Sequence, residues 1–269
     1  MKNKKRFNQI CKDIKSIKIQ GARNIAKAGL KAYALNPTKQ AKTKLLSLRL
    51  TEPMLQHVLN LADKQPTEKI LNHFDEAQEK INKHILKLIK PKDVIFTHCH
   101  STNVTHSLIN AKKKKKNFEV YNTETRPLFQ GRKTARELKK HNIKVTMFID
   151  SALAIALEKR QNTKKANKIF LGADALTKKG IINKIGSRTI AELAHLHKIP
   201  LYIIADSWKY SKTPVPIEQR ALNEVWDRAP KSIKIKNPAF DFVPKKYITK
   251  IITEHGNLTY NKFLEKVNK

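Results

Sequence analysis

From residue 93 onward, short apolar segments alternate with polar turns and helical patterns, and this alternation constrains the fold more than any other feature. The expected strands are residues 94–97, 118–122, 144–149, 168–171 and 201–205, and the expected helices are 102–112, 132–141, 151–159 and 187–197. Parallel strands need a crossover that returns over the sheet face, and that crossover is usually a helix. The sequence therefore predicts an α/β fold with a Rossmann-like, mostly parallel, doubly wound sheet.

The first 90 residues follow a different pattern, in which apolar residues recur at mostly helical spacing between prolines. The helical patterns cover 14–26, 45–61 and 70–89; Pro53 and Pro66 interrupt them, and Pro91 ends this part of the chain. We therefore predict two domains, a helical N-terminal domain over 1–90 and an α/β catalytic domain over 91–269.

The chain is strongly basic, with 56 Lys+Arg against 22 Asp+Glu and a net charge of +34. Such a surface attracts polyanions and anionic substrates, although lysines spread over solvated helix faces give the same excess. The sequence has no zinc-finger, RNA-recognition or basic-zipper motif, so nucleic-acid binding would rest on charge alone. It also has two cysteines and no apolar run near the roughly 20 residues of a membrane span, so we expect a cytoplasmic protein without disulfides.

Cys99 follows the apolar segment 94–97 directly, between His98 and His100. In open α/β sheets, ligands bind at the carboxyl ends of the strands, which is where this thiol is expected to emerge. A helix beginning at Thr102 would lower the pKa of the thiol through its amide dipoles. The thiol is therefore a candidate catalyst, and the alternative is a buried, inert cysteine.

Asp174 repeats this layout, because it follows the apolar segment 168–171 by three residues. A partly desolvated carboxyl group at a strand end can stay protonated and act as a general acid. The alternative is an aspartate that caps a helix or a turn.

Basic and amide side chains at other strand ends suggest a substrate with more than one negative group. Arg126 can bind phosphate in a bidentate manner, and a helix that begins near Gly131 adds free amide donors. Asn183 and Lys184 precede another helix, and Lys209 follows the segment 201–205.

A metal ion and a nucleotide cofactor are not expected. His98, Cys99, His100 and His106 lie close in sequence, but strand alternation turns Cys99 away from the two flanking histidines. The sequence contains no G-x-G-x-x-G or Walker motif.

Several blocks of residues together resemble one known family. It contains ribose-1,5-bisphosphate isomerase, methylthioribose-1-phosphate isomerase and the alpha, beta and delta regulatory subunits of the initiation factor 2 exchange factor. The matching blocks are residues 97–99, 124–131, 145–151, 172–174, 180–186, 237–241 and 251–256. The blocks at 124–131 and 237–241 most resemble the archaeal ribose-1,5-bisphosphate isomerase.

The resemblance implies that Cys99 is the catalytic base and Asp174 the acid, since the translation-factor branch usually has serine in place of this cysteine. It implies no cofactor, and assembly as a homo-oligomer, either a dimer or a hexamer. The candidate substrate-binding residues are Gly21, Ala22, Arg23, Ser101, Thr102, Asn103, Arg126, Gln130, Asn183, Lys184 and Lys209.

The first domain departs from the isomerase pattern. The family's Arg-Gly-Ala-Gly-Arg type phosphate cradle corresponds to Gln20–Asn24 here, where Arg23 is the residue that could compensate. An arginine expected in this domain corresponds to Lys42, and the usual Cys-Asn-Ser is Cys99-His-Ser. These changes place one phosphate subsite in question.

The leading hypothesis is an aldose–ketose isomerase of nucleotide salvage that converts ribose 1,5-bisphosphate to ribulose 1,5-bisphosphate. One alternative is a non-catalytic, initiation-factor-like subunit that binds a nucleotide or sugar phosphate and a protein partner. Another is an isomerase of a sugar monophosphate such as methylthioribose 1-phosphate.

Overall fold

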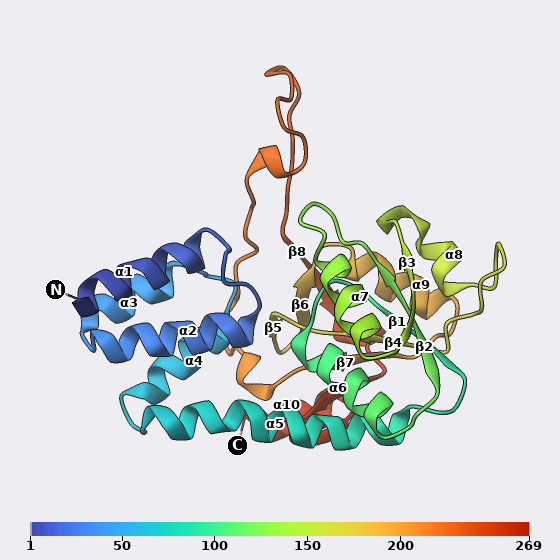
Figure 1. The fold of residues 1–269 in the computed structure, drawn as a ribbon, viewed down its shortest axis with the longest axis horizontal. Coiled ribbons are helices and arrows are strands. Elements are labelled where there is room, and N and C mark those ends of the chain that lie inside the picture. The colour runs from blue at the N-terminus through green and yellow to red at the C-terminus, as the bar shows by residue number, and fades with distance from the viewer. Residues whose placement is uncertain (1, 269) are drawn as a thin grey trace.

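The computed structural model describes residues 2–268, so the outermost residues of the two expected domains, 1 and 269, lie outside the described part. The N-terminal part is helical (Figure 1). Its helices are α1 (Lys2–Lys15), α2 (Ala22–Leu35), α3 (Lys39–Ser47), α4 (Pro53–Ala62) and α5 (Thr67–Leu88). Pro53 and Pro66 lie at the expected breaks between helices, with Pro53 in the first turn of α4 and Pro66 as the N-cap of α5. Proline fits a helix start because its missing N–H would have no partner there.

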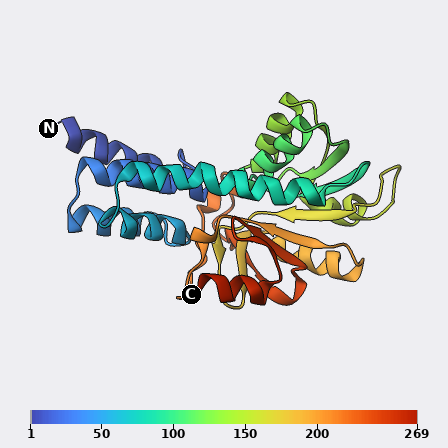
Figure 2. The ribbon, with the colours of Figure 1, turned by 90° about the horizontal axis from the view of Figure 1, so that it is seen from below.

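The long helix α5 joins the two parts of the molecule. Its first half packs Ile70 and Phe74 against α2 and α4, and its second half packs Ile81 and Ile85 against the central sheet. Figure 2 shows α5 running from the N-terminal helices across the sheet. The helical part is therefore fixed to the sheet by a shared helix rather than by a linker.

The central sheet has the strand order β10-β9-β7-β4-β1-β2-β3, and all neighbouring strands are parallel except β9 and β10. The strands are β1 (Asp93–Thr97), β2 (Phe118–Thr123), β3 (Lys144–Phe148), β4 (Lys168–Leu171), β7 (Leu201–Ile204), β9 (Lys250–Thr253) and β10 (Gly256–Leu258). The order reverses between β1 and β4, as in doubly wound nucleotide-binding folds, and ligands bind in the crevice at that point.

Helices cover both faces of this sheet, which confirms the predicted doubly wound α/β fold. Side chains alternate along a strand, so Val94 and Phe96 belong to one core cluster while Ile95 belongs to the other. Helices α5, α6 (Thr102–Lys113) and α7 (Gln130–Lys140) pack on the Ile95 side, and α8 (Leu153–Leu157), α9 (Ser187–Leu196) and α10 (Tyr260–Val267) pack on the other.

A second, antiparallel sheet lies at the carboxyl edge of the first. It contains β5 (Ala175–Leu176), β6 (Gly180–Lys184) and β8 (Phe240–Pro244) in the order β5-β6-β8. Between β7 and β8 the chain extends outward as an arm over residues 211–239 (Figure 1, orange). The base of the arm holds the segment before α4, because Thr51 Oγ1 donates to Pro216 O at 2.7 Å and Arg49 Nε lies 3.2 Å from Glu218 Oε1. This arm and the small sheet were not predicted from the sequence.

Among residues 2–268, no helix is both long and apolar enough to cross a membrane.

Candidate active site

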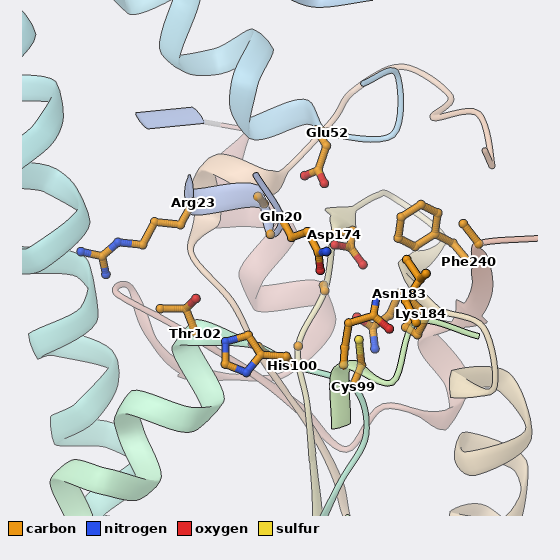
Figure 3. Close-up of a pocket in the computed structure, with 18 of the residues that line it drawn as sticks. Gln20, Arg23, Glu52, Cys99, His100, Thr102, Asp174, Asn183, Lys184 and Phe240 are labelled. Carbon is orange, nitrogen blue, oxygen red and sulfur yellow. The ribbon is translucent and has the colours of Figure 1, made fainter. Parts of the chain in front are cut away.

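A cavity lies between the N-terminal helices and the carboxyl edge of the central sheet (Figure 3). It is lined by both predicted catalytic residues and by most of the predicted substrate-binding residues. These are Gly21, Ala22, Arg23, Cys99, Ser101, Thr102, Asn103, Gln130, Asp174, Asn183, Lys184 and Lys209.

Cys99 stands just beyond the end of β1 with a φ of 66°, a left-handed conformation that is uncommon outside glycine. Two threonines hold this turn: Thr125 Oγ1 accepts from the Cys99 amide at 3.0 Å, and Thr134 Oγ1 donates to the Cys99 carbonyl at 2.8 Å. A backbone conformation that is rare in proteins, yet held by hydrogen bonds on both sides, is typical of a residue presented to a ligand. The local geometry therefore aims the thiol into the cavity.

The thiol is protonated at neutral pH. Burial raises the pKa of Cys99 to about 11, while the nearby Lys184 ammonium acts in the opposite direction and Asp174 adds to the rise. The expectation that α6 would lower the pKa of this thiol is therefore wrong in direction. The cause is desolvation, which in an enclosed site outweighs the dipole of a helix start.

Asp174 follows β4 and reaches the same cavity, where its backbone N–H donates to Ile182 O of β6 at 2.9 Å. Burial raises the pKa of Asp174 above the ordinary value, and the cations Lys209 and Lys184 work against this rise. The structure thus provides the partly desolvated carboxyl group that a general acid needs.

Close packing at the strand ends brings these two groups together. The register of β1 on β4 pairs Thr97 with Phe170, so the chain beyond each strand runs side by side. A Cβ on Gly172 would lie 2.5 Å from Ser101 Oγ, so only glycine fits there. Ser101 is the N-cap of α6, and its hydroxyl accepts from Val104 N at 3.4 Å.

Two lysines supply positive charge on the sheet side of the cavity. Lys184 on β6 places Nζ 4.9 Å from the centre of the Phe240 ring. Lys209 is 7% exposed, and its ammonium donates to Ala173 O at 2.6 Å. Asn183 is oriented by donating its amide to Ser187 Oγ at 2.8 Å. This arrangement suits an anionic ligand, because ammonium and amide groups are donors to phosphate oxygens.

Arg23 lines the cavity, but its charged group is turned away from it. The guanidinium forms an ion pair with Asp75 of α5 at 2.5 Å, and Figure 3 shows the side chain pointing toward that helix. The compensation for the altered Gln20–Asn24 segment that was expected of Arg23 is therefore not present in this conformation.

Arg126, predicted to bind substrate, is not among the residues that line the cavity. Its guanidinium donates to Val225 O of the arm at 3.0 Å and lies 5.1 Å from the Phe129 ring centre. Its backbone amide donates to Asp150 Oδ2 at 2.6 Å, which holds the turn after β2.

An arginine of the first domain that was not predicted from the sequence lines the cavity. Lys42 is bound to Asp63 at 2.6 Å and is not among the cavity residues, whereas Arg49 lines the cavity together with Glu52. The one sequence signal near Arg49 and Glu52 is Thr51-Glu52-Pro53, because proline after a polar residue marks a helix start. That signal places the helix start but not the cavity it faces.

The histidines beside Cys99 are held as neutral hydrogen-bonding groups. His98 Nε2 donates to Ile185 O at 2.8 Å, and burial lowers its pKa. His100 Nδ1 lies 3.0 Å from Thr134 Oγ1, and burial with the nearby Lys133 charge lowers the pKa of His100 to about 4. Among the described residues, clustered potential metal ligands occur elsewhere, at His73, Asp206 and Glu254.

Comparison with known proteins identifies the family. The model of the Initiation factor 2 subunit family matches residues 18–260, so the chain belongs to that family. A close match in structure is the translation initiation factor eIF-2B of Pyrococcus horikoshii OT3, with a TM-score of 0.81 and 27% identity over 94% of this chain and 97% of that one.

Within the family, the chain is similar to enzymes. It is 36% identical over 277 residues to ribose 1,5-bisphosphate isomerase of Methanocaldococcus jannaschii, covering 90% of this chain and 88% of that protein. It is 35% identical over 208 residues to methylthioribose-1-phosphate isomerase of Dehalococcoides mccartyi, covering 70% of this chain and 61% of that protein.

Proposed function

We propose that this protein is a cytoplasmic aldose–ketose isomerase that converts ribose 1,5-bisphosphate to ribulose 1,5-bisphosphate. The observation that carries the proposal is the joint presence of Cys99 and Asp174 in a cavity lined by Lys184 and Lys209. The 36% identity to a ribose 1,5-bisphosphate isomerase over nearly the whole chain supports the same substrate.

The reaction moves two protons within one molecule. The minor thiolate form of Cys99 removes the proton from C2, the C1–C2 double bond forms, and the bond from C1 to the ring oxygen breaks. Asp174 gives its proton to that oxygen. The hydroxyl on C2 then loses its proton to the carboxylate as the ketone forms, and C1 takes the proton from Cys99. Positioned proton donors and acceptors of this kind each accelerate a reaction about 10²–10⁴-fold.

Turnover of the bisphosphate by purified protein tests the proposal. We expect ribulose 1,5-bisphosphate to form with the wild type and not with Cys99→Ala, while both proteins show the same far-UV circular dichroism. Equal turnover by the two proteins, or none by the wild type, would exclude this function.

A sugar monophosphate is a second candidate substrate, because the Arg23 guanidinium is occupied by Asp75 rather than free in the cavity. A substrate panel that compares ribose 1,5-bisphosphate with methylthioribose 1-phosphate decides between the two. Faster turnover of the monophosphate would favour this second candidate.

A non-catalytic, initiation-factor-like role is supported by the structural similarity to eIF-2B and by the altered Gln20–Asn24 segment. Specific, salt-resistant binding to the initiation factor 2 alpha subunit, without turnover of any sugar phosphate, would favour that role.

The protein is also proposed to form a homo-oligomer. Met147 and Ile149, on and just after the edge strand β3, are 46% and 61% exposed, and Trp226 on the arm is 50% exposed. Exposed apolar groups of this size are typical of contact surfaces. Light scattering on the eluting protein tests for a dimer or a hexamer, and a monomer at micromolar concentration would reject the proposal.

A further inference from the structure

Glu52 brings a second carboxyl group to the cavity from the helical part of the molecule. It is the N-cap of α4, and the preceding residue is anchored to the arm through Thr51 Oγ1 and Pro216 O. The Thr51 amide also donates to Glu218 Oε1 at 3.4 Å. The position of Glu52 is therefore fixed from the outside of the cavity.

The carboxyl group itself is enclosed and incompletely paired. Glu52 is 3% exposed, and within residues 2–268 its buried Oε2 has no hydrogen-bond partner. Its Oε1 lies 3.7 Å from Arg49 Nη2, too far for a good hydrogen bond, because Arg49 binds Glu218 through Nε. Figure 3 shows the group pointing into the cavity toward Asp174.

We propose that Glu52 and Asp174 act as a carboxyl pair that holds one transferable proton for the isomerisation. The inference deepens the proposed function and rests on it. Neither the resemblance nor the position of a strand end assigned a role to Glu52.

The pair fits the two proton transfers that the reaction makes at oxygen atoms. One proton travels from C2 to C1 through Cys99, and the second must travel from the hydroxyl on C2 to the ring oxygen. A proton leaves the pair for the ring oxygen when the ring opens, and the pair recovers a proton from the hydroxyl when the ketone forms. Two carboxyl groups that share one proton can serve both oxygen atoms, and no other reactant is needed.

The charges around Glu52 fit a group that keeps its proton. Burial raises the pKa of Glu52 to about 8, with the Asp174 charge adding to the rise and Arg49 and Lys209 opposing it. Glu218 on the arm adds a further negative charge. Arg220, also at the cavity, is paired with Glu224 at 2.6 Å. Two neighbouring carboxyl groups cannot both ionise readily, so the last proton is retained by the pair.

The pH dependence of kcat/KM tests the proposal through Glu52→Gln, which keeps the shape of the side chain but cannot transfer a proton. In the wild type, the rate should rise about tenfold per pH unit with the thiolate fraction of Cys99, then level off near pH 8 where the pair loses its proton. In Glu52→Gln, Asp174 loses its negative neighbour, so the pKa of Asp174 falls. The value of kcat/KM should therefore level off at a lower pH than in the wild type. The variant should match the wild type in acid and be at least about tenfold slower above pH 8.

Two further variants separate proton transfer from positioning. Glu52→Asp keeps a carboxyl group and should level off near the wild-type pH. Glu218→Gln removes a negative charge that raises the pKa of both Glu52 and Asp174 but leaves both carboxyl groups in place, so the rate should level off at a lower pH without the tenfold loss expected of Glu52→Gln. A loss in Glu52→Gln that is equal at every pH, or an unchanged profile, would overturn the proposal.

An infrared measurement tests the pair even if the protein does not turn over this sugar. A band of protonated carboxyl groups should remain in the wild type at pH 7 and decrease in Glu52→Gln. No difference between the two spectra would overturn the carboxyl pair, whereas absence of turnover by the wild type would overturn the proposed function alone.

Discussion

The two sides of the cavity differ in how completely they match an isomerase. The sheet side carries Cys99, Asp174 and Lys184, which line the cavity as the resemblance implied. The helical side carries Arg23, which is bound to Asp75, and the unexpected Glu52. In the isomerase that we propose, the ends of the sheet strands carry the chemistry, while the helical part adjusts which substrate binds and how the proton is held.

The largest expected effect is on the sheet side, in Cys99→Ser. A hydroxyl is a much weaker acid than a thiol, so it supplies almost no anionic base, and kcat should fall by about 10²–10⁴-fold. Steady-state kinetics measures the fall, and an unchanged unfolding midpoint shows that the fold is intact. A serine variant as active as the wild type would remove the sheet side from the chemistry.

Gly172→Ala should come next. The added Cβ would lie 2.5 Å from Ser101 Oγ and 2.7 Å from Ser101 Cβ, so the strand end has to shift. Overpacking of this kind costs about 1–3 kcal/mol of unfolding free energy, and it should also displace Cys99 and slow turnover. Urea unfolding measures the first effect and an activity assay the second. Ser101→Gly in the same chain removes the obstructing side chain and should recover part of the stability.

On the helical side, Glu52→Gln should change how the unfolding free energy depends on pH. The pKa of Glu52 is raised to about 8 in the folded protein, above its unfolded value near 4.5. The protonated form therefore stabilises the fold at low pH, and this contribution is lost as pH rises through 8. The wild type should lose about 1 kcal/mol per pH unit relative to the variant between pH 5 and 8.

Denaturant titrations at several pH values measure that difference. Glu192→Gln on α9 is the control, because this side chain is paired with Arg188 near the surface. A constant difference between the wild type and Glu52→Gln from pH 5 to 9 would show that Glu52 carries an ordinary carboxylate.

The smallest effect is expected for Asp75→Asn, which frees Arg23. Asp75 is 74% exposed at its side chain, so the ion pair is weak. A released guanidinium can turn toward the cavity and bind a second phosphate, so KM for the bisphosphate should fall by about fivefold or less. KM for a monophosphate serves as the control. An equal change for both substrates would show that Arg23 does not distinguish them.

The strand at residues 168–171 and the helix that begins at residue 102 were predicted correctly as strand and helix, with nearly the right bounds. Their apolar patterns are local, and crossovers force parallel strands to align their carboxyl ends. The β5-β6-β8 sheet was missed because β6 and β8 pair across about 60 residues, and the arm that precedes β8 has no periodicity. The position of Arg126 could not be predicted because it is set by contacts with Asp150 and Val225, which are distant in sequence.

By itself, the sequence determined that a thiol and a carboxyl group end neighbouring strands of a parallel sheet. The tertiary structure alone decided that burial raises the pKa of Cys99, that Asp75 occupies Arg23, and that Glu52 joins Asp174. The physical reason is the separation along the sequence of the groups that interact. Strand ends follow from hydrogen-bonded neighbours and short crossovers, whereas desolvation and ion pairing depend on groups that only the packing of distant segments brings together.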